Sequence, residues 1–159
     1  MYGHRFAGAR VLLGHMRSAH AGDRKAQTKV KEMVLYQALQ AAGVHFEFQK
    51  FIPFAACKIN SKTKYAFADF VIAAHWGYTI LECDELQHRA YATDCDVRRD
   101  FDIAASVAAG SGHKIKIIHY DPDAFCLDGV TQHEYKASRI ARLLEVISEE
   151  PVQFERIFI

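Results

Sequence analysis

Proline and glycine are scarce in this chain, and several common sequence signals are missing from it. Its 159 residues include three prolines and nine glycines, and neither a GxGxxG nor a GxxxxGK pattern occurs. This absence excludes the glycine-rich loops that hold the phosphates of dinucleotides and nucleoside triphosphates. No internal repeat or low-complexity tract occurs either. We therefore expect a globular protein that does not bind nucleotides through such loops.

Cysteine is also infrequent, and the four cysteines lie far apart. With no CxxC pair and no secretory leader, the pattern predicts reduced thiols in an intracellular protein. A structural zinc domain is an alternative, because cysteine and histidine are preferred zinc ligands. The irregular spacing speaks against such a site, which would use Cys83, His88, Cys95 and Cys126.

Long apolar runs are missing as well. None approaches the roughly 20 residues that span a bilayer, so no membrane partner is expected. Hydrophobic residues make up 50% of the chain, and this composition and length predict one domain with a single core over residues 26–159. Residues 1–25 are expected to form a basic arm or helix ahead of it.

Acidic residues are nearly absent from the first 31 residues, which contain seven basic side chains and one acidic side chain. Because the net charge of the whole chain is only +1, the remainder is more acidic. A basic arm before an acidic body suits a protein that binds a phosphate backbone and also holds a cation. An organelle transit peptide over residues 1–22 and an ordinary solvated helix remain open as alternatives.

Hydrophobic periodicity predicts alternating helices and strands. In chain order these are a helix over 26–42, strands over 44–54, 65–73 and 78–83, a helix from Thr93 to Gly110, a strand over 114–120, and a helix opened by a capping box at Thr131 and Glu134. The tail over 151–159 could add an edge strand. This order predicts an α/β fold in which helices flank a small mixed sheet.

Three acidic residues are expected to meet beside the hairpin of the second and third strands. Counted outward from its turn, Asp69 is level with Glu82 to Asp84, and Glu82 and Asp84 share one side. Such close carboxylates repel each other, and a divalent cation bound by their oxygens removes the repulsion. The alternative is three unrelated surface acids, which a register slip of one residue would scatter.

The residues around this cluster resemble a known nuclease superfamily. The central pattern is a strand followed by Glu-x-Asp-x-x-Gln-His, which runs from Glu82 to His88. Further matching segments, within residues 28–147, are Asp69-Phe70, Tyr91, Cys95 to Arg99 and Tyr120 to Phe125. The chain resembles the PD-(D/E)XK, or restriction-endonuclease-like, superfamily, in a branch similar to the very-short-patch-repair and EDxHD homing endonucleases.

The resemblance implies an α-β-β-β-α-β-α core and a Mg²⁺-dependent DNA endonuclease in which Mn²⁺ substitutes for Mg²⁺. The positions that match the family's catalytic residues are Glu32, Asp69, Glu82, Asp84, Gln87 and His88. Asp69, Glu82 and Asp84 would hold the metal. Two departures stand out: Asp84 replaces the lysine of many members, as is usual in this branch, and Phe67-Ala68 replaces an Arg-Pro pair.

Because the motif lysine is missing, another group must orient or deprotonate the attacking water. His88, four residues after Asp84, is the preferred candidate because the ordinary pKa of histidine is about 6.5. Lys50 is the alternative. The histidines at 75, 113, 119 and 133 do not stand, as His88 does, beside a glutamine at the end of a carboxylate-bearing strand.

Basic residues supply the expected contacts with DNA. They are Arg24, Lys25, Lys29, Arg98 and Arg99. Arg98 and Arg99 could instead pair with the motif acids, and Arg98 with Asp102 one helical turn later. A double-strand cutter would need two active sites, as in a homodimer, whereas a nicking enzyme would need one. An alternative function is a nucleic-acid-binding module on the same fold that has lost catalysis.

Overall fold

The computed structural model describes residues 24–54, 65–84, 93–109, 112–123, 125–127, 130–132 and 136–159. The chain divides into two compact units, residues 1–44 and 45–159. In the first unit, helix α2 spans Arg24–Ala41. Gly43 adopts a left-handed φ of 73°, and the N–H of Val44 donates to the carbonyl of Leu39 over 3.0 Å. This glycine cap ends the helix where the sequence predicts.

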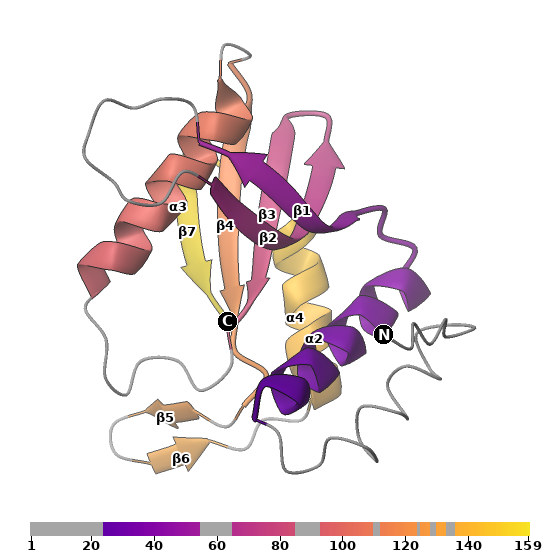
Figure 1. Cartoon of the computed structure of the whole chain (residues 1–159). Coiled ribbons are helices and arrows are strands. Elements are labelled where there is room, and N and C mark those ends of the chain that lie inside the picture. Colours follow the sequence, from indigo (N-terminus) through magenta and orange to yellow (C-terminus); the bar gives the residue numbers. More distant parts are fainter. Residues whose placement is uncertain are drawn as a thin grey trace, which may run out of the picture. The chain divides into compact units, whose positions relative to one another are not determined.

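The second unit is built on a five-stranded mixed sheet (Figure 1). Its strands, in spatial order, are β1 (Glu47–Pro53), β2 (Tyr65–Ala74), β3 (Gly77–Cys83), β4 (Lys114–Tyr120) and β7 (Glu155–Phe158). The first three pair antiparallel, whereas β3–β4 and β4–β7 pair parallel. The expected mixed sheet is confirmed, and the C-terminal tail does form an edge strand.

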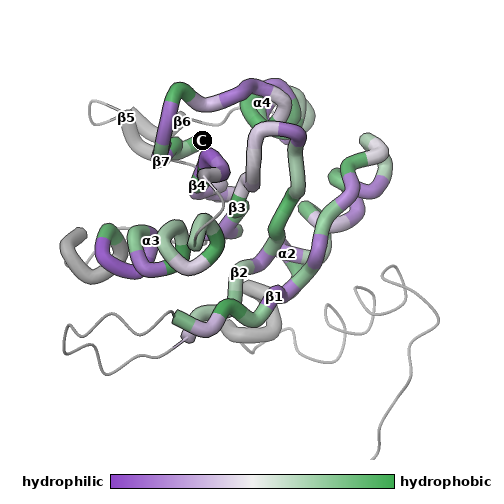
Figure 2. Tube along the Cα trace, turned by 90° about the horizontal axis from the view of Figure 1, so that it is seen from above, coloured by the Kyte–Doolittle hydropathy of each residue, from purple (hydrophilic) through white to green (hydrophobic). Residues whose placement is uncertain are grey.

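Two helices cover opposite faces of this sheet, as Figures 1 and 2 show from two directions. They are α3 (Thr93–Ala108) and α4 (Lys136–Ser148). On β4, Ile117 belongs to an apolar cluster that includes Ile103 of α3. The neighbouring Lys116 donates to the carbonyls of Val146 and Glu149 at the end of α4. Successive strand residues point to opposite faces, so the two helices lie on opposite sides.

Lys116 fastens α4 to the sheet. Its side chain is 1% exposed, and burial lowers its pKa. The last carbonyls of a helix lack intrahelical donors and carry partial negative charge, which a lysine ammonium satisfies. The ammonium also lies 5.3 Å from the centre of the Trp76 ring. These contacts compensate the ammonium group of Lys116 for its loss of water on burial.

One apolar cluster of the core lies between α3 and the sheet. Its buried members are Ile52, Ala66, Ala68, Val71, Ile80, Ile103, Ala104, Ile115 and Ile117. The colouring of Figure 2 shows hydrophobic segments along the strands of this layer. Each large aliphatic side chain buried there contributes about 1.5–3 kcal/mol relative to exposure. The core therefore fixes the strand ends that carry the acidic residues.

The β2–β3 turn depends on Gly77. This residue has a φ of 151°, and a Cβ atom there would lie 2.0 Å from the carbonyl oxygen of Lys114. The N–H of Lys114 donates to the carbonyl of Trp76 over 3.1 Å. Only glycine lets β4 start this close to the hairpin.

One predicted boundary is wrong. The capping box at Thr131 and Glu134 does not open the last helix, because α4 begins at Lys136. Thr131 instead lies in strand β6 (Val130–Gln132), which pairs antiparallel with β5 (Phe125–Leu127) in a separate two-stranded sheet. Val130 and Thr131 are β-branched, and this local preference for strand outweighs the capping pattern.

Candidate functional site

The register of the β2–β3 hairpin places Asp69 level with Glu82. The final backbone pair of this ladder is Phe70 with Leu81, so the next position would set Asp69 against Glu82. Beyond the last backbone pair, the side chain of Asp69 joins the two strands: its Oδ2 accepts a hydrogen bond from the N–H of Cys83 over 2.9 Å. The predicted alignment of these two acids is confirmed, and the register slip is excluded.

A second contact holds the Asp69 carboxylate from the other side. Oδ1 accepts a hydrogen bond from Gln49 Nε2 over 3.0 Å. Gln49 has a left-handed φ of 52°, and the β1–β2 ladder skips it. Burial raises the pKa of Asp69, the Cys83 N–H opposes this shift, and the nearby charge of Asp84 adds to it. Asp69 is thus fixed in position and its negative charge is disfavoured.

Among the described acids at this end of the sheet, Glu82 has the most strongly shifted pKa. Its side chain lies on β3 and is only 5% exposed. Burial raises its pKa to about 8; the Arg99 guanidinium opposes that shift, and the charges of Asp69 and Asp84 reinforce it. Arg99 Nη2 lies 3.2 Å from Oε1, close enough for an ion pair, yet this oxygen has no hydrogen-bond donor among the described residues.

Arg99 also connects α3 to β2. Its Nη2 donates a hydrogen bond to the carbonyl of Phe67 over 3.0 Å. The same guanidinium therefore faces the backbone of β2 and the carboxylate of β3. Arg99 offsets part of the negative charge of Glu82 and links helix α3 to strand β2.

A buried network extends from Asp84 through His119 to Asp100. His119 lies on β4 beside Glu82, with which it is paired in the parallel ladder. Its Nδ1 contacts Asp84 Oδ2, and its Nε2 lies 2.8 Å from Asp100 Oδ2 on α3. Arg156 of β7 donates from Nε to the same Asp100 oxygen over 2.7 Å. These side chains join β4, β7 and α3 to Asp84, the residue that follows β3.

Electrostatics within this network favours a protonated imidazole. Burial alone would lower the pKa of His119, but hydrogen bonds to Asp100 and Asp84 outweigh it and raise the pKa to about 9. Burial would raise the pKa of Asp100, but His119 and Arg156 lower it. A protonated ring donates from both nitrogens. The ring of Phe158 stacks on it with centroids 4.8 Å apart.

The acids at this site have the chemistry of hard-cation ligands, although they do not yet converge. Among the described residues, no three acidic, imidazole or thiol side chains come together as a formed metal site. Asp69 is held by Gln49 and Cys83, and Asp84 by His119. Oε1 of Glu82 is buried and lies 3.2 Å from Arg99 Nη2, but it has no hydrogen-bond partner among the described residues. Oxygen ligands and mutual repulsion fit a divalent cation, which would require these carboxylates to turn toward it.

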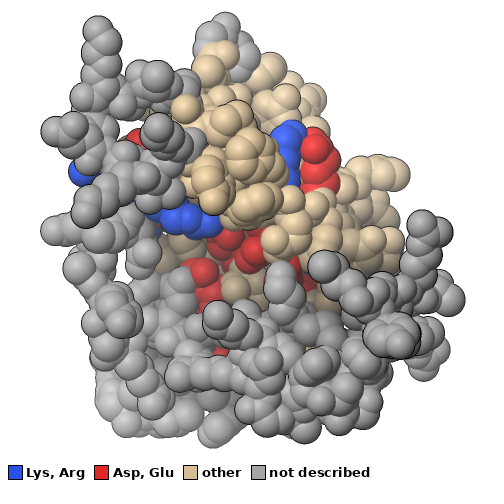
Figure 3. Space-filling view, in the orientation of Figure 1, with Lys and Arg blue, Asp and Glu red and all other residues tan. Residues whose placement is uncertain are grey.

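Charges of both signs are visible among the described residues on one face of the structure (Figure 3). On the face drawn in Figure 3, coloured acidic and basic atoms lie against one another, so the described part of this face shows no extended area of one sign. The basic residues predicted to contact DNA differ in their surroundings. Arg99 faces Glu82, whereas Arg98 is exposed on α3. The side chains of Arg24, Lys25 and Lys29 lie outside the described residues.

Other expected site residues lie elsewhere or outside the described structure. Glu32 is a buried residue of α2 and belongs to the first unit, at 5% exposure. Gln87 and His88 lie outside the described residues. Cys83 is a buried cysteine of β3, whereas the side chains of its three suggested zinc partners lie outside the described residues. Lys50 pairs with Glu47 over 2.6 Å on β1.

The sequence interpretation missed His119, Asp100 and Arg156. In the sequence, His119 does not follow a strand that carries carboxylates, so it is not among the predicted site residues. A signal was available, because Glu82 and His119 each stand near the end of a hydrophobic strand. Only the parallel pairing of β3 and β4 turns that similarity into contact.

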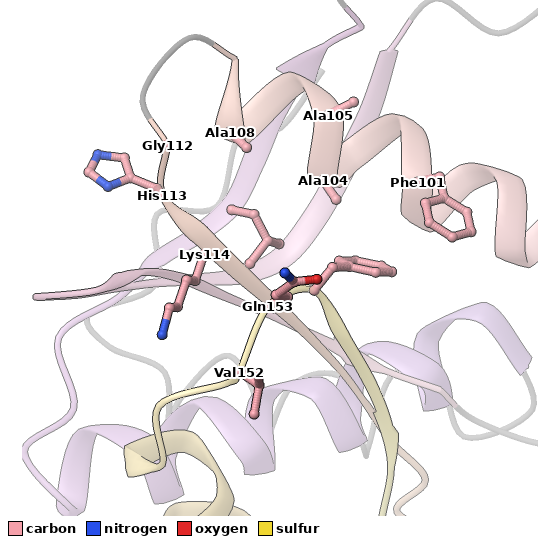
Figure 4. A pocket seen from close by; sticks show the side chains of 11 residues that line it. Phe101, Ala104, Ala105, Ala108, Gly112, His113, Lys114, Val152 and Gln153 are labelled. Carbon is pink, nitrogen blue, oxygen red and sulfur yellow. The ribbon is translucent and has the colours of Figure 1, made fainter.

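An open pocket of about 610 Å³ lies away from these acids. Figure 4 shows Phe101 and Ala104 of α3 on one side, and Val152 and Gln153 on the other. Lys114, at the first position of β4, lines it, whereas His119 is near the opposite end of that strand. The pocket is separate from the carboxylate site.

Comparisons with known proteins add little to this picture. No family model and no curated protein matches the chain. A crystal structure of a protein of unknown function is similar at a TM-score of 0.39 and 9% identity, over 80% of this chain and 55% of that one. The chain thus spans about half the length of that protein. Within the described residues, no helix is long and apolar enough to cross a membrane. The topology of the chain itself assigns the fold class, which is an α/β unit with a mixed sheet.

Proposed function

We propose that this chain is a Mg²⁺-dependent DNA endonuclease of the PD-(D/E)XK kind. The observation that carries the proposal is Glu82, a glutamate buried to 5% exposure and placed beside Asp69 and Asp84, one of whose oxygens has no hydrogen-bond partner among the described residues. Burying an acid without full compensation is costly, and such groups concentrate at functional sites. These three positions also match the superfamily motif.

Asp69, Glu82 and Asp84 would hold the metal. When bound, Mg²⁺ would polarise the scissile phosphate and lower the pKa of a coordinated water, and Mn²⁺ would substitute for it. Glu32 is proposed to assist from α2, as the superfamily resemblance implies. The remaining chemistry belongs to side chains that position these acids and handle protons.

His119 is suited to positioning rather than to proton abstraction. Both of its ring nitrogens face carboxylates, and its raised pKa keeps it protonated near neutral pH. A protonated imidazole cannot accept another proton. Its role is to hold Asp84, while Arg99 holds Glu82. The proposed water-orienting base therefore remains His88, with Gln87 beside it.

DNA is the proposed substrate, in an intracellular setting of homing or repair. Arg98, the basic residues of α2 and the basic arm over residues 1–25 would contact phosphates, whose neutralisation gives salt-dependent affinity. A single site of this kind makes a nick. A double-strand cut would need two sites, which a homodimer would provide.

Incubation with supercoiled plasmid tests this function. The purified chain should convert plasmid to nicked or linear product with Mg²⁺ or Mn²⁺ and should leave it intact with EDTA. Cleavage that persists in EDTA, or its absence with either metal, would contradict the proposal. Tight DNA binding without cleavage would indicate the alternative, a nucleic-acid-binding module on the same fold.

A further inference from the structure

Three aromatic side chains form an exposed cluster on β1 and β2. Phe51, Tyr65 and Phe67 are 52%, 49% and 49% exposed. The ring centroids are 5.3 Å apart for Phe51 and Tyr65, 5.4 Å for Phe51 and Phe67, and 5.8 Å for Tyr65 and Phe67. Single exposed hydrophobic residues are ordinary, but a contiguous group of large rings marks a surface that contacts something.

This aromatic cluster is directly connected to the carboxylate site. Phe67 precedes Asp69 by two residues on β2, about 7 Å along an extended strand. Its carbonyl accepts the hydrogen bond from Arg99, and Arg99 also faces Glu82. A molecule on the rings would therefore lie next to the proposed site of cleavage.

The surrounding features disfavour a second copy of this chain as the occupant. β1 is an edge strand, the usual place for strand addition between copies. However, Gln49 interrupts its ladder with a left-handed φ of 52°, and Pro53 removes a backbone donor at its end. The ion pair of Glu47 and Lys50 adds charge to the same strand. Interruptions, proline and charge are common devices that protect an edge from pairing.

Charge and ring chemistry instead suit nucleic-acid bases. The chain between the paired residues Pro53 and Tyr65 contains three lysines and no acidic residue. Proteins bind single strands by combining exposed aromatic rings, on which the faces of unpaired bases stack, with cations that neutralise the phosphates. Bases inside a duplex are already stacked and offer no free faces.

We propose that Phe51, Tyr65 and Phe67 stack against unpaired bases, and that the substrate is DNA with a single-stranded segment beside the cleaved phosphate. This inference rests on the proposed nuclease function, which it makes more specific. It assigns the aromatic cluster to substrate binding and leaves the reaction at the carboxylates.

Binding in EDTA tests the inference without cleavage. The probes are a fluorescein-labelled single-stranded DNA oligonucleotide and its duplex, with affinity measured by anisotropy. Phe51→Leu and Phe67→Leu should each weaken single-strand binding about tenfold, the scale of one lost base–aromatic stack, and change duplex binding less than twofold. The matched control is Phe101→Leu, a similarly exposed ring at 53% on α3, which should leave both affinities unchanged.

Several outcomes would overturn it. Unchanged single-strand affinity in both cluster variants, with each variant folded by circular dichroism, would remove the rings from substrate binding. Equal losses for duplex and single strand would refute the preference for unpaired bases. A dimeric wild type that the Phe67→Leu variant makes monomeric, with DNA binding intact, would assign the cluster to self-association. If plasmid cleavage is metal-dependent while these variants bind normally, the nuclease function stands and this inference fails.

Discussion

His119 Nε2 donates a hydrogen bond to Asp100 Oδ2 over 2.8 Å, which joins strand β4 to helix α3 beside Glu82. Asp100 is 1% exposed and also binds Arg156. The carboxylate is therefore the acceptor that keeps two cations in place. Its loss should affect stability and the ionisation of His119 together.

Asp100→Asn should lower the pKa of His119 and destabilise the fold. The hydrogen bond and the charge of Asp100 both raise that pKa, and the substitution removes the charge. Breaking one partner of a buried ion pair typically costs about 3–5 kcal/mol. Urea unfolding and NMR titration of the imidazole measure the two effects. Asp102→Asn on the same helix is the control, and equal effects from both variants would refute the network.

The free energy of unfolding in the absence of metal should fall as pH rises. The pKa of Glu82 is raised from 4.5 to about 8, so between these values the folded protein retains a proton that the unfolded chain has released. This bound proton stabilises the folded state fully below about pH 4.5. The stabilisation, which amounts to a few kcal/mol, is lost as the pH rises through 8. Above pH 6.5, His119 also contributes to the fall in the free energy of unfolding, because its pKa is raised to about 9 in the folded protein.

Glu82→Gln separates these two contributions. Glutamine does not titrate, so the variant should keep its stability between pH 5 and 6.5, where the wild type declines. Thermal melts in EDTA at closely spaced pH values provide the comparison. Parallel curves for the two proteins would show that Glu82 is not the titrating group.

The hairpin illustrates what sequence alone can predict. Alternating hydrophobic residues and a short turn fix the strands, and counting from the turn aligns Asp69 with Glu82, because antiparallel neighbours are linked locally. His119 could not be placed in this way. Its strand joins β3 in parallel, through a helix and over a long separation, so its contact with Asp84 depends on tertiary packing.

Local sequence patterns also failed where two preferences competed. The pattern of Thr131 and Glu134 is typical of a helix start, yet Thr131 lies in β6. Conversely, nothing in the sequence around Gln49 indicates its left-handed backbone, which serves to bring the amide to Asp69. The strand at Thr131 follows from local β preference and from pairing with the nearby β5, whereas the backbone of Gln49 depends on Asp69, which lies on another strand.

Asp69→Asn should abolish cleavage while preserving the fold. The asparagine oxygen can still accept the N–H of Cys83, and the Gln49 amide can turn to accept from the new NH₂ group. Because the pKa of Asp69 is raised, a neutral side chain should keep or increase stability without metal. Thermal melts and plasmid cleavage are the measurements. A folded variant that cleaves at the wild-type rate would exclude Asp69 from the site.

His88→Ala should lower single-turnover cleavage about a hundredfold, the usual scale for a lost general base. Metal affinity should change little. Lys50→Ala should cost much less, because Lys50 is engaged with Glu47. Rates measured against pH for both variants distinguish them. An unchanged rate for His88→Ala beside a collapsed rate for Lys50→Ala would reverse the assignment.

Single-turnover cleavage of supercoiled plasmid by Glu82→Gln, beside Glu145→Gln, tests the central claim most directly. Glu145 is an exposed residue of α4, so its variant has the same chemical change away from the site. With Mg²⁺ in excess, Glu145→Gln should match the wild type, and Glu82→Gln should lose cleavage by at least a hundredfold while melting as a folded protein. Equal rates for the two variants would show that the carboxylates beside Glu82 do not form a nuclease site.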